Sequence, residues 1–165
     1  MSARQTAPPE VFISYAREDA RFKEGLVKQL KTLERQGIIS AWHDGLLVAG
    51  QKWDEVIVSR LDRSRLILFL VSPDFADSDY IHRVELKRAS ERHAAGEVSV
   101  IPVLIRNVHG WRNEPFGNLK LGDFQALPSD TRFVTEWGNR DKAFADVAAG
   151  IERAVEELKP KTAAG

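Results

Sequence analysis

The sequence predicts a three-layer α/β fold of the flavodoxin type, with a central parallel five-stranded sheet in the order 2-1-3-4-5 and helices on both faces. Short apolar runs alternate along the chain with segments of helical periodicity, which is typical of a parallel sheet wrapped by helices. The run 66–71 is the most apolar and predicts a central strand that is buried on both faces. Right-handed crossovers then place helices on the two faces, and this strand order accommodates them.

Composition indicates one ordinary globular domain. The chain has 165 residues, and its 24 basic side chains equal its 24 acidic ones, so no overall field favours nucleic acid or an anionic membrane. The absence of cysteine excludes disulfides, thiolate zinc sites and a cysteine nucleophile. The first nine residues lack the apolar core of a signal peptide, and no apolar run approaches ~18 residues. We therefore expect a cytoplasmic protein that binds neither nucleic acid nor membrane directly.

The first half of the chain predicts two strands and two helices. A strand over 11–15 is followed by a helix whose apolar stripe ends before Gly37. A second strand over 38–42 leads through a glycine-containing loop, 44–52, into the next helix. The apolar residues of that helix recur every four positions, and they are Trp53, Ile57 and Leu61. We expect Trp53 to anchor the helix in the core rather than to contact a ligand.

The middle of the chain predicts the central strand, a helix and a fourth strand. Ser72 and Pro73 close the strand 66–71, and a helix is expected from about Tyr80 to Ala95. Its N-cap is predicted among Asp77, Ser78 and Asp79, and Gly96 stops it. A strand over 98–105 follows.

The last third predicts a loop, a short edge strand and a final helix. Residues 106–122 have the composition of a loop, and a short strand is expected at 124–127. The final helix has an apolar stripe that ends at Leu158. The domain is predicted to span 10–159, and 1–9 and 160–165 are expected to be flexible tails or linker stubs.

The predicted topology locates a ligand site. In this strand order the chain reverses direction between strands one and three, and ligands bind outside the carboxyl ends of the strands at that reversal. This predicts a site at 14–17, at 72–79 and at the first turns of the helix after strand three. Glu85 lies in the second of those turns.

Several stretches in a fixed order resemble the bacterial Toll/interleukin-1 receptor (TIR) domain family. Together they cover about 11–158, and they are Val11-Phe12-Ile13-Ser14-Tyr15-Ala16 with Asp19, Trp42-His43-Asp44, Gly50 with Trp53, Leu70-Val71-Ser72-Pro73-Asp74-Phe75, Ser78-Asp79-Tyr80, Val84-Glu85-Leu86-Lys87-Arg88-Ala89, Val100-Ile101-Pro102-Val103 and Trp137-Gly138-Asn139-Arg140-Asp141. No single stretch is specific, but their shared order and spacing are.

The resemblance implies an activity and a catalytic residue. Many bacterial members of the family cleave the nicotinamide–ribose bond of NAD⁺, giving nicotinamide and ADP-ribose or a cyclic isomer of it. The family's essential glutamate maps to Glu85. NAD⁺ is then a substrate, and no cofactor or metal is implied. Members of this type often act in anti-phage defence or signalling, activated by assembly through a fused or separate sensor module.

The chemistry suits a single carboxylate. Nicotinamide leaves NAD⁺ as a neutral molecule, so no acid is needed, while positive charge develops on the ribose and a carboxylate stabilises it. The competing interpretation makes Glu85 a solvated helix carboxylate that pairs with Arg88. The positions expected to bind substrate are Ser14, Tyr15, Asp44, Ser72, Tyr80 and Ile81.

Each of these substrate-binding positions has a simpler interpretation. Ser14 and Tyr15 could serve strand-end packing, and Asp44 a loop turn. Animal relatives often carry an aromatic residue at the position of Ile81, which stacks on nicotinamide. The aliphatic side chain here departs from that pattern, and Tyr80 or His82 could substitute.

The loop 44–52 corresponds to the family's BB loop and carries the apolar triplet Leu46-Leu47-Val48. Such a triplet predicts self-association through this loop, whereas the alternative is that it folds back on its own sheet. A non-catalytic TIR–TIR interaction module is therefore the rival function, and a nucleoside-processing transferase with the same fold is a third.

Other site types find little support. The segment 45–52 resembles a phosphate-binding P-loop, but Gln51 separates Gly50 from Lys52 and no serine or threonine follows. The four histidines have no metal-ligand spacing. The basic residues around Arg83 and Lys87 are interpreted as a solvated face, with attraction of a diphosphate as the alternative.

Overall fold

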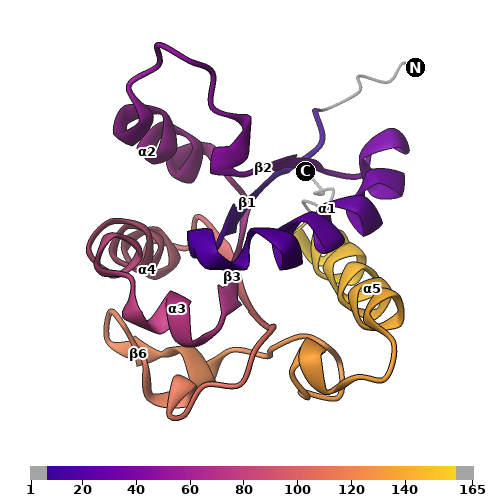
Figure 1. The fold of residues 1–165 in the computed structure, drawn as a ribbon. Helices are drawn as coiled ribbons and strands as arrows, with labels where there is room; N and C mark the ends of the chain where they lie inside the picture. Colours follow the sequence, from indigo (N-terminus) through magenta and orange to yellow (C-terminus); the bar gives the residue numbers. More distant parts are fainter. Residues whose placement is uncertain (1–6, 159–165) are drawn as a thin grey trace, which may run out of the picture.

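The computed structural model describes residues 7–158, which form a parallel sheet between two layers of helices (Figure 1). The sheet strands are β1 (Glu10–Ser14), β2 (Ser40–Trp42), β3 (Leu66–Val71) and β4 (Ser99–Leu104). They pair in the order β2-β1-β3-β4, all in parallel. The predicted flexible tails lie outside the described residues except for residues 7–9, and the predicted domain bounds are not tested.

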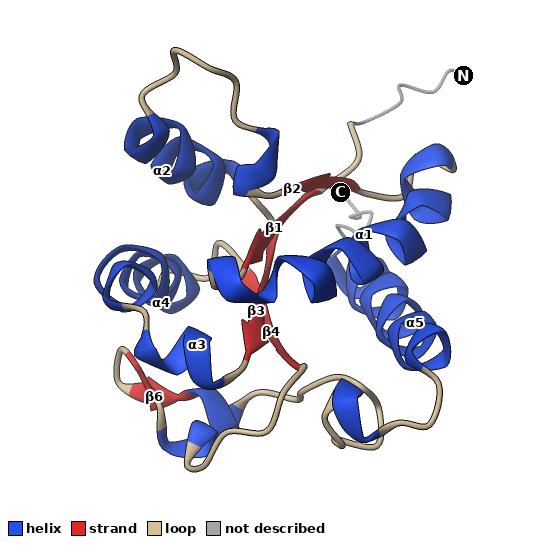
Figure 2. Cartoon of the chain, in the orientation of Figure 1, coloured by secondary structure: helices blue, strands red, loops and turns tan. Residues whose placement is uncertain are grey.

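Within the described part of the chain five α-helices surround the sheet, and shorter helical turns connect them (Figure 2). The helices are α1 (Ala20–Arg35), α2 (Trp53–Arg63), α3 (Pro73–Asp77), α4 (Lys87–Ala94) and α5 (Arg140–Leu158). The turns are η1 (Arg17–Asp19), η2 (Asp44–Leu46), the π-helical η3 (Ile81–Leu86), η4 (Trp111–Asn113), η5 (Leu121–Asp123) and η6 (Val134–Glu136).

Alternate residues of the strands face opposite helical layers. Ile13 and Leu68 belong to a core shared with α1 and α5, whereas Phe12 and Phe69 pack with α2, α3 and α4. Figure 1 shows the same division, with α1 and α5 on one side of the sheet. In the first core, α1 and α5 approach so closely that a Cβ on Gly25 would lie 2.9 Å from the ring of Phe144. The prediction of an α/β fold with helices on both faces is confirmed.

The predicted fifth strand is wrong, because it is reduced to one bridge between Val103 and Leu127 in a parallel sense. Leu127 donates to the carbonyl of Pro102 at 2.9 Å and accepts from Leu104 at 2.8 Å. Pro128 follows immediately and has no N–H to continue a ladder. Over residues 7–158 the main sheet therefore has four strands.

Two other segments contain more structure than expected. Ser72 and Pro73 close the central strand as predicted, and Pro73 also begins the short helix α3, with the Ser72 hydroxyl as its N-cap. The predicted loop 106–122 contains a small hairpin of β5 (Pro115–Phe116) and β6 (Leu119–Lys120). Both segments lie near the carboxyl end of the sheet.

The helix predicted from Tyr80 to Ala95 is present but not uniform. The Ser78 hydroxyl accepts a hydrogen bond from the Ile81 amide at 3.2 Å, which confirms one of the three predicted caps. Residues 81–86 then form a π-helical turn before α4 begins at Lys87. Single π turns inside helices occur frequently at functional sites. Among the described residues, no helix combines the length and the apolar character needed to cross a bilayer.

Candidate functional site

Glu85 is buried at the carboxyl end of the sheet, within the π-helical turn η3. Its side chain is 7% exposed, and its Oε1 accepts a 2.5 Å hydrogen bond from the hydroxyl of Ser14 at the end of β1. The alternative pairing with Arg88 is wrong, because Arg88 donates to Asp62 at 2.5 Å and to Glu91 at 3.2 Å instead. Glu85 is thus a buried carboxylate whose hydrogen bond comes from a neutral hydroxyl.

Burial perturbs the ionisation of Glu85. Loss of hydration raises the pKa of its carboxyl from 4.5 to about 7, and the negative charge of Asp44 raises it as well. The hydrogen bond from Ser14 favours the charged form and lowers the pKa. A carboxyl that changes charge near neutral pH inside a cleft is typical of a functional site.

Glu85 lines a cavity of about 720 Å³, which has an apolar and a polar side. The apolar side comes from the loop after β2, α2 and the start of η3, and it consists of Leu47, Trp53, Ile57, Tyr80 and Ile81. The polar side comes from η1, α3 and the residue that follows α3, and it consists of Arg17, Glu18, Asp74, Asp77 and Ser78. A concave site of this size with aromatic and convergent polar groups suits a small organic ligand.

Trp53 forms part of the cavity wall, so the prediction that it anchors α2 in the core is wrong. Its side chain is 54% exposed, and its ring lies 5.0 Å from the ring of Tyr80. Because α2 follows β2 in a parallel sheet, the first residue of this helix lies at the same edge as Glu85. That topological argument, applied to Trp53, would have found it from the sequence.

Tyr80 carries an unusual hydroxyl. Within the described part of the chain its oxygen is buried and has no hydrogen-bond partner. Burial and the charge of Glu85 raise the pKa of Tyr80 to about 12, so the hydroxyl is a neutral donor. Buried polar groups in proteins are nearly always hydrogen-bonded, so this unpaired hydroxyl beside the cavity is an exception.

Tyr15 and Asp44 lie together at the mouth of the cavity, as expected for substrate-binding positions. Burial and a hydrogen bond to Asp44 raise the pKa of Tyr15 above its ordinary value. His43, next to Asp44, is 8% exposed and accepts a hydrogen bond from the amide of Gly45 at 3.1 Å. This contact fixes the start of η2, where the backbone carbonyl of Asp44 accepts from the amide of Leu47 at 3.1 Å, and Asp44 also lines the cavity.

The remaining predicted positions differ in whether they line the cavity. Ile81 lines it, whereas Ser72 does not. Ser72 is fully buried and caps α3 while donating to Asp19 at 2.5 Å, so it has a structural role. His82 contacts Glu114 and the carbonyl of Ser78, both at 2.8 Å, and is not part of the cavity lining.

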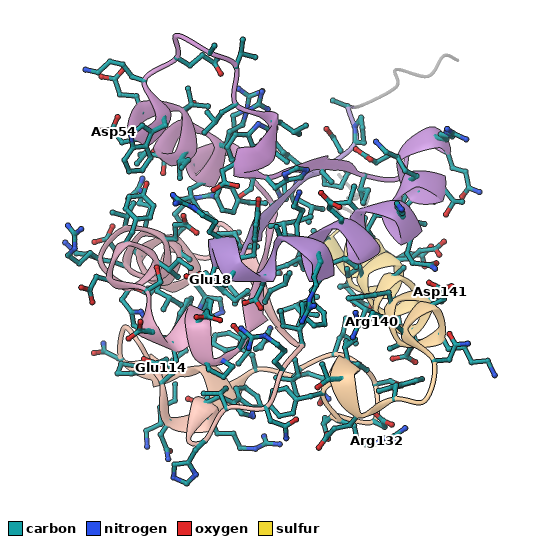
Figure 3. All side chains as sticks on the ribbon, in the orientation of Figure 1. Glu18, Asp54, Glu114, Arg132, Arg140 and Asp141 are labelled. Atoms are coloured by element: carbon teal, nitrogen blue, oxygen red, sulfur yellow. The ribbon has the colours of Figure 1, made fainter. Side chains whose placement is uncertain are left out.

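A second groove, of about 930 Å³, runs between α2 and η3 on the outer surface. It shares Trp53, Tyr80 and Arg83 with the Glu85 cavity, so the aromatic pair separates the two. Asp54, labelled at the start of α2 in Figure 3, lines only this outer groove. The carboxylates and arginines of the outer groove are exposed, whereas Glu85 is buried, so the Glu85 cavity is the better candidate for a functional site. Within residues 7–158 no cluster of three acidic or histidine side chains could hold a metal ion.

Comparison with known proteins agrees with this fold. Residues 11–137 match the family model of the TIR domain. The chain belongs to the TIR domain family. The match includes β1, the loop after β2 and η3, which supply the walls of the cavity, and it confirms the family predicted from the sequence.

One relative and two solved structures illustrate the similarity of this TIR domain to other proteins. The uncharacterised protein y4lF of Sinorhizobium fredii is 40% identical over 146 residues, which are 88% of this chain and 43% of that protein. The chain therefore spans less than half the length of this relative. TIR domains of the activated Roq1 resistosome, which recognises the pathogen effector XopQ, superpose with a TM-score of 0.53 at 22% identity, over 92% of this chain and 85% of theirs. A prokaryotic SEFIR domain gives a TM-score of 0.49 at 17% identity, over 94% and 99%.

Proposed function

We propose that this TIR domain cleaves the nicotinamide–ribose bond of NAD⁺, with Glu85 as the catalytic residue. The observation that carries the proposal is a buried carboxylate, 2.5 Å from the Ser14 hydroxyl, in a cavity of about 720 Å³ at the carboxyl ends of β1 and β3. Membership of the family supports it, since many bacterial members catalyse this reaction.

The reaction balances without an added acid or oxidant. The bond between ribose C1′ and the pyridinium nitrogen breaks, and its electron pair leaves with nicotinamide, which becomes neutral. The ionised Glu85 stabilises the positive charge that develops on the ribose. Water then bonds to C1′ and loses a proton to give ADP-ribose, or a nucleophilic atom of the ADP-ribosyl group itself attacks C1′ to give a cyclic isomer.

The aromatic wall suits the leaving base. The rings of Trp53 and Tyr80 offer a surface for a flat pyridinium, and the positively charged ring gains from the electron-rich faces of aromatic side chains. This pair takes the place of the aromatic residue that animal relatives carry at position 81. Arg17 and Arg83, the two cations of the lining, suit the diphosphate.

Association with another TIR domain, which is also the basis of the rival function, is supported by a separate observation. Leu46 is 51% exposed and Val48 is 65% exposed, on the loop that arches above α2 in Figure 2. Leu47 between them packs against the core of the α2 side, so only part of the triplet folds back. Two exposed apolar side chains on one loop favour contact with another TIR domain. We infer that assembly through 44–52, driven by a fused or separate sensor module, activates cleavage in bacterial defence or signalling.

The experiment that separates these functions is product analysis. The pure domain is incubated with NAD⁺ and, separately, with nucleosides, and products are separated by chromatography and identified by mass. Nicotinamide with ADP-ribose or its cyclic isomer supports the proposal and distinguishes hydrolysis from cyclisation. Turnover of nucleosides while NAD⁺ stays intact would support a transferase instead. No turnover of either substrate, even when the domains are clustered, would support the non-catalytic interaction module.

A further inference from the structure

Arg106 bridges two segments that carry the polar side of the Glu85 cavity. Its Nε donates to Oδ1 of Asp19 at 2.8 Å, and its Nη2 donates to Oδ2 of Asp74. Asp19 ends η1, and Asp74 belongs to α3. The guanidinium group is a planar, rigid fork, so it fixes the separation of the two carboxylates that it joins.

The anchor of this bridge is fully buried. Asp19 has no exposed area, and its second oxygen accepts a 2.5 Å hydrogen bond from Ser72. Burial of a carboxylate is unfavourable, and a paired, hydrogen-bonded carboxylate recovers only part of that loss. Well-packed apolar residues often stabilise such a position at least as well. The notable feature of this pair is therefore the geometry that it fixes.

Arg106 does not itself reach the cavity. It is absent from the cavity lining, although residues on both sides of the bridge, among them Arg17, Glu18 and Asp74, are part of it. Figure 3 shows Glu18 close to α3, where the two segments face each other. The role of Arg106 is therefore to position these lining residues.

We propose that Arg106 is a positioning residue that sets the spacing between η1 and α3, and through it the affinity for the half of the dinucleotide distal to nicotinamide. This inference rests on the proposed cleavage of NAD⁺. Arg17, at the start of η1, is one of the two cations of the cavity lining and suits the diphosphate, and Arg106 holds η1 in place through Asp19. Rigid placement of polar groups there favours binding by lowering the entropy lost in ordering them.

Arg106→Lys tests the proposal in a protein that still folds. Lysine keeps a positive charge beside the buried Asp19, but a single ammonium group cannot span Asp19 and Asp74 as the fork does. We expect the Kd for ADP-ribose, measured by calorimetry, to rise about tenfold, the effect of losing one charge-assisted contact. The Kd for nicotinamide should stay within about twofold. Arg132→Lys is the matched control, since it makes the same change at the exposed Arg132–Asp130 pair.

A double-mutant cycle tests whether Arg106 influences ADP-ribose binding through its bridge to Asp74. Arg106→Lys and Asp74→Asn each break the same bridge, so the double variant should change the binding free energy of ADP-ribose by less than the sum of the two single changes. An unchanged Kd for ADP-ribose in Arg106→Lys, equal weakening of nicotinamide, or no ADP-ribose binding by the wild type would each overturn the inference. Calorimetry does not depend on turnover, so ADP-ribose binding with no NAD⁺ cleavage would refute the proposed function and leave the bridge supported.

Discussion

The hydroxyl of Ser14 donates a 2.5 Å hydrogen bond to Oε1 of Glu85, which joins the end of β1 to the π-helical turn η3. This bond acts against burial, which raises the pKa of Glu85 to about 7. The proposed reaction requires an ionised Glu85, so we expect Ser14 to increase the ionised fraction of Glu85 at neutral pH. The same contact joins the carboxylate to the end of β1.

Removal of this hydroxyl should move the pH dependence of cleavage. For the wild type we expect kcat/KM to rise with pH through a midpoint near 7, the pKa of Glu85 in the free protein. Ser14→Ala should shift that midpoint upward by about one pH unit, since a hydrogen bond to a charged group is lost. Activity at pH 7 then falls and recovers at higher pH. The measurement is a profile of kcat/KM against pH.

Asp44→Asn provides the opposite change. The charge of Asp44 raises the pKa of Glu85, so its removal should move the midpoint to lower pH. If both variants moved the midpoint in one direction, or if neither moved it, Glu85 would not be the group that controls the profile.

The burial of Glu85 should also be visible in stability. Its pKa is about 7 in the folded protein and about 4.5 in the unfolded chain, so the folded state binds more protons between these values. The stability that protonated Glu85 contributes is complete below pH 4.5 and is lost as pH rises through 7, an effect of about 3 kcal/mol. Glu85→Gln should remove this loss, and denaturant unfolding at several pH values measures it. Glu91→Gln, at an exposed carboxylate, should behave as the wild type.

Trp53 should contribute to substrate binding through its exposed ring. We expect Trp53→Ala to raise KM for NAD⁺ by about tenfold, within the range of ~1–3 kcal/mol measured for stacking of a base on an aromatic side chain. Val58→Ala is the control, because Val58 lines the outer groove and not the Glu85 cavity. Steady-state kinetics give the KM for NAD⁺ in both variants. A larger increase in KM for Val58→Ala than for Trp53→Ala would indicate that NAD⁺ binds in the outer groove instead.

Assembly should depend on the exposed apolar residues of the loop 44–52. We expect turnover per subunit to rise steeply with protein concentration in the wild type. Replacement of Leu46 and Val48 together by serine should flatten that dependence, because two apolar side chains no longer leave water on association. Light scattering over the same concentrations reports the assembly itself. A flat dependence in the wild type would argue against activation by assembly.

Much of the fold follows from local patterns in the sequence. The apolar run 66–71 gave the central strand β3, and the stripe that begins at Phe22 gave α1, which ends before Gly37, where φ is +74°. The short strand expected at 124–127 depended on tertiary context, because Leu127 pairs with β4 and Pro128 prevents further pairing. A local sequence pattern cannot show how many residues of an edge segment will pair with the neighbouring strand.

The site was predictable where topology alone determines position. The ends of β1 and β3 in a parallel sheet directed attention to Ser14, Tyr15 and Glu85, and the structure brings all three together. Helical periodicity gave a wrong prediction at Trp53, because an apolar residue that shares the four-residue spacing of a helix's apolar face is normally buried. The bridge from Asp19 to Arg106 joins residues 87 positions apart, and no spacing in the sequence indicates it.

The measurement that tests the central claim most directly is nicotinamide release from NAD⁺ by the wild type, Glu85→Gln and Glu91→Gln at equal, high concentration. Glutamine keeps the size of Glu85 and removes its charge, and Glu91 offers the same change on an exposed face of α4. The account predicts release by the wild type and by Glu91→Gln, and a loss of at least about a hundredfold in Glu85→Gln. Release by Glu85→Gln at the wild-type rate, or none by the wild type when the domains are clustered, would contradict it.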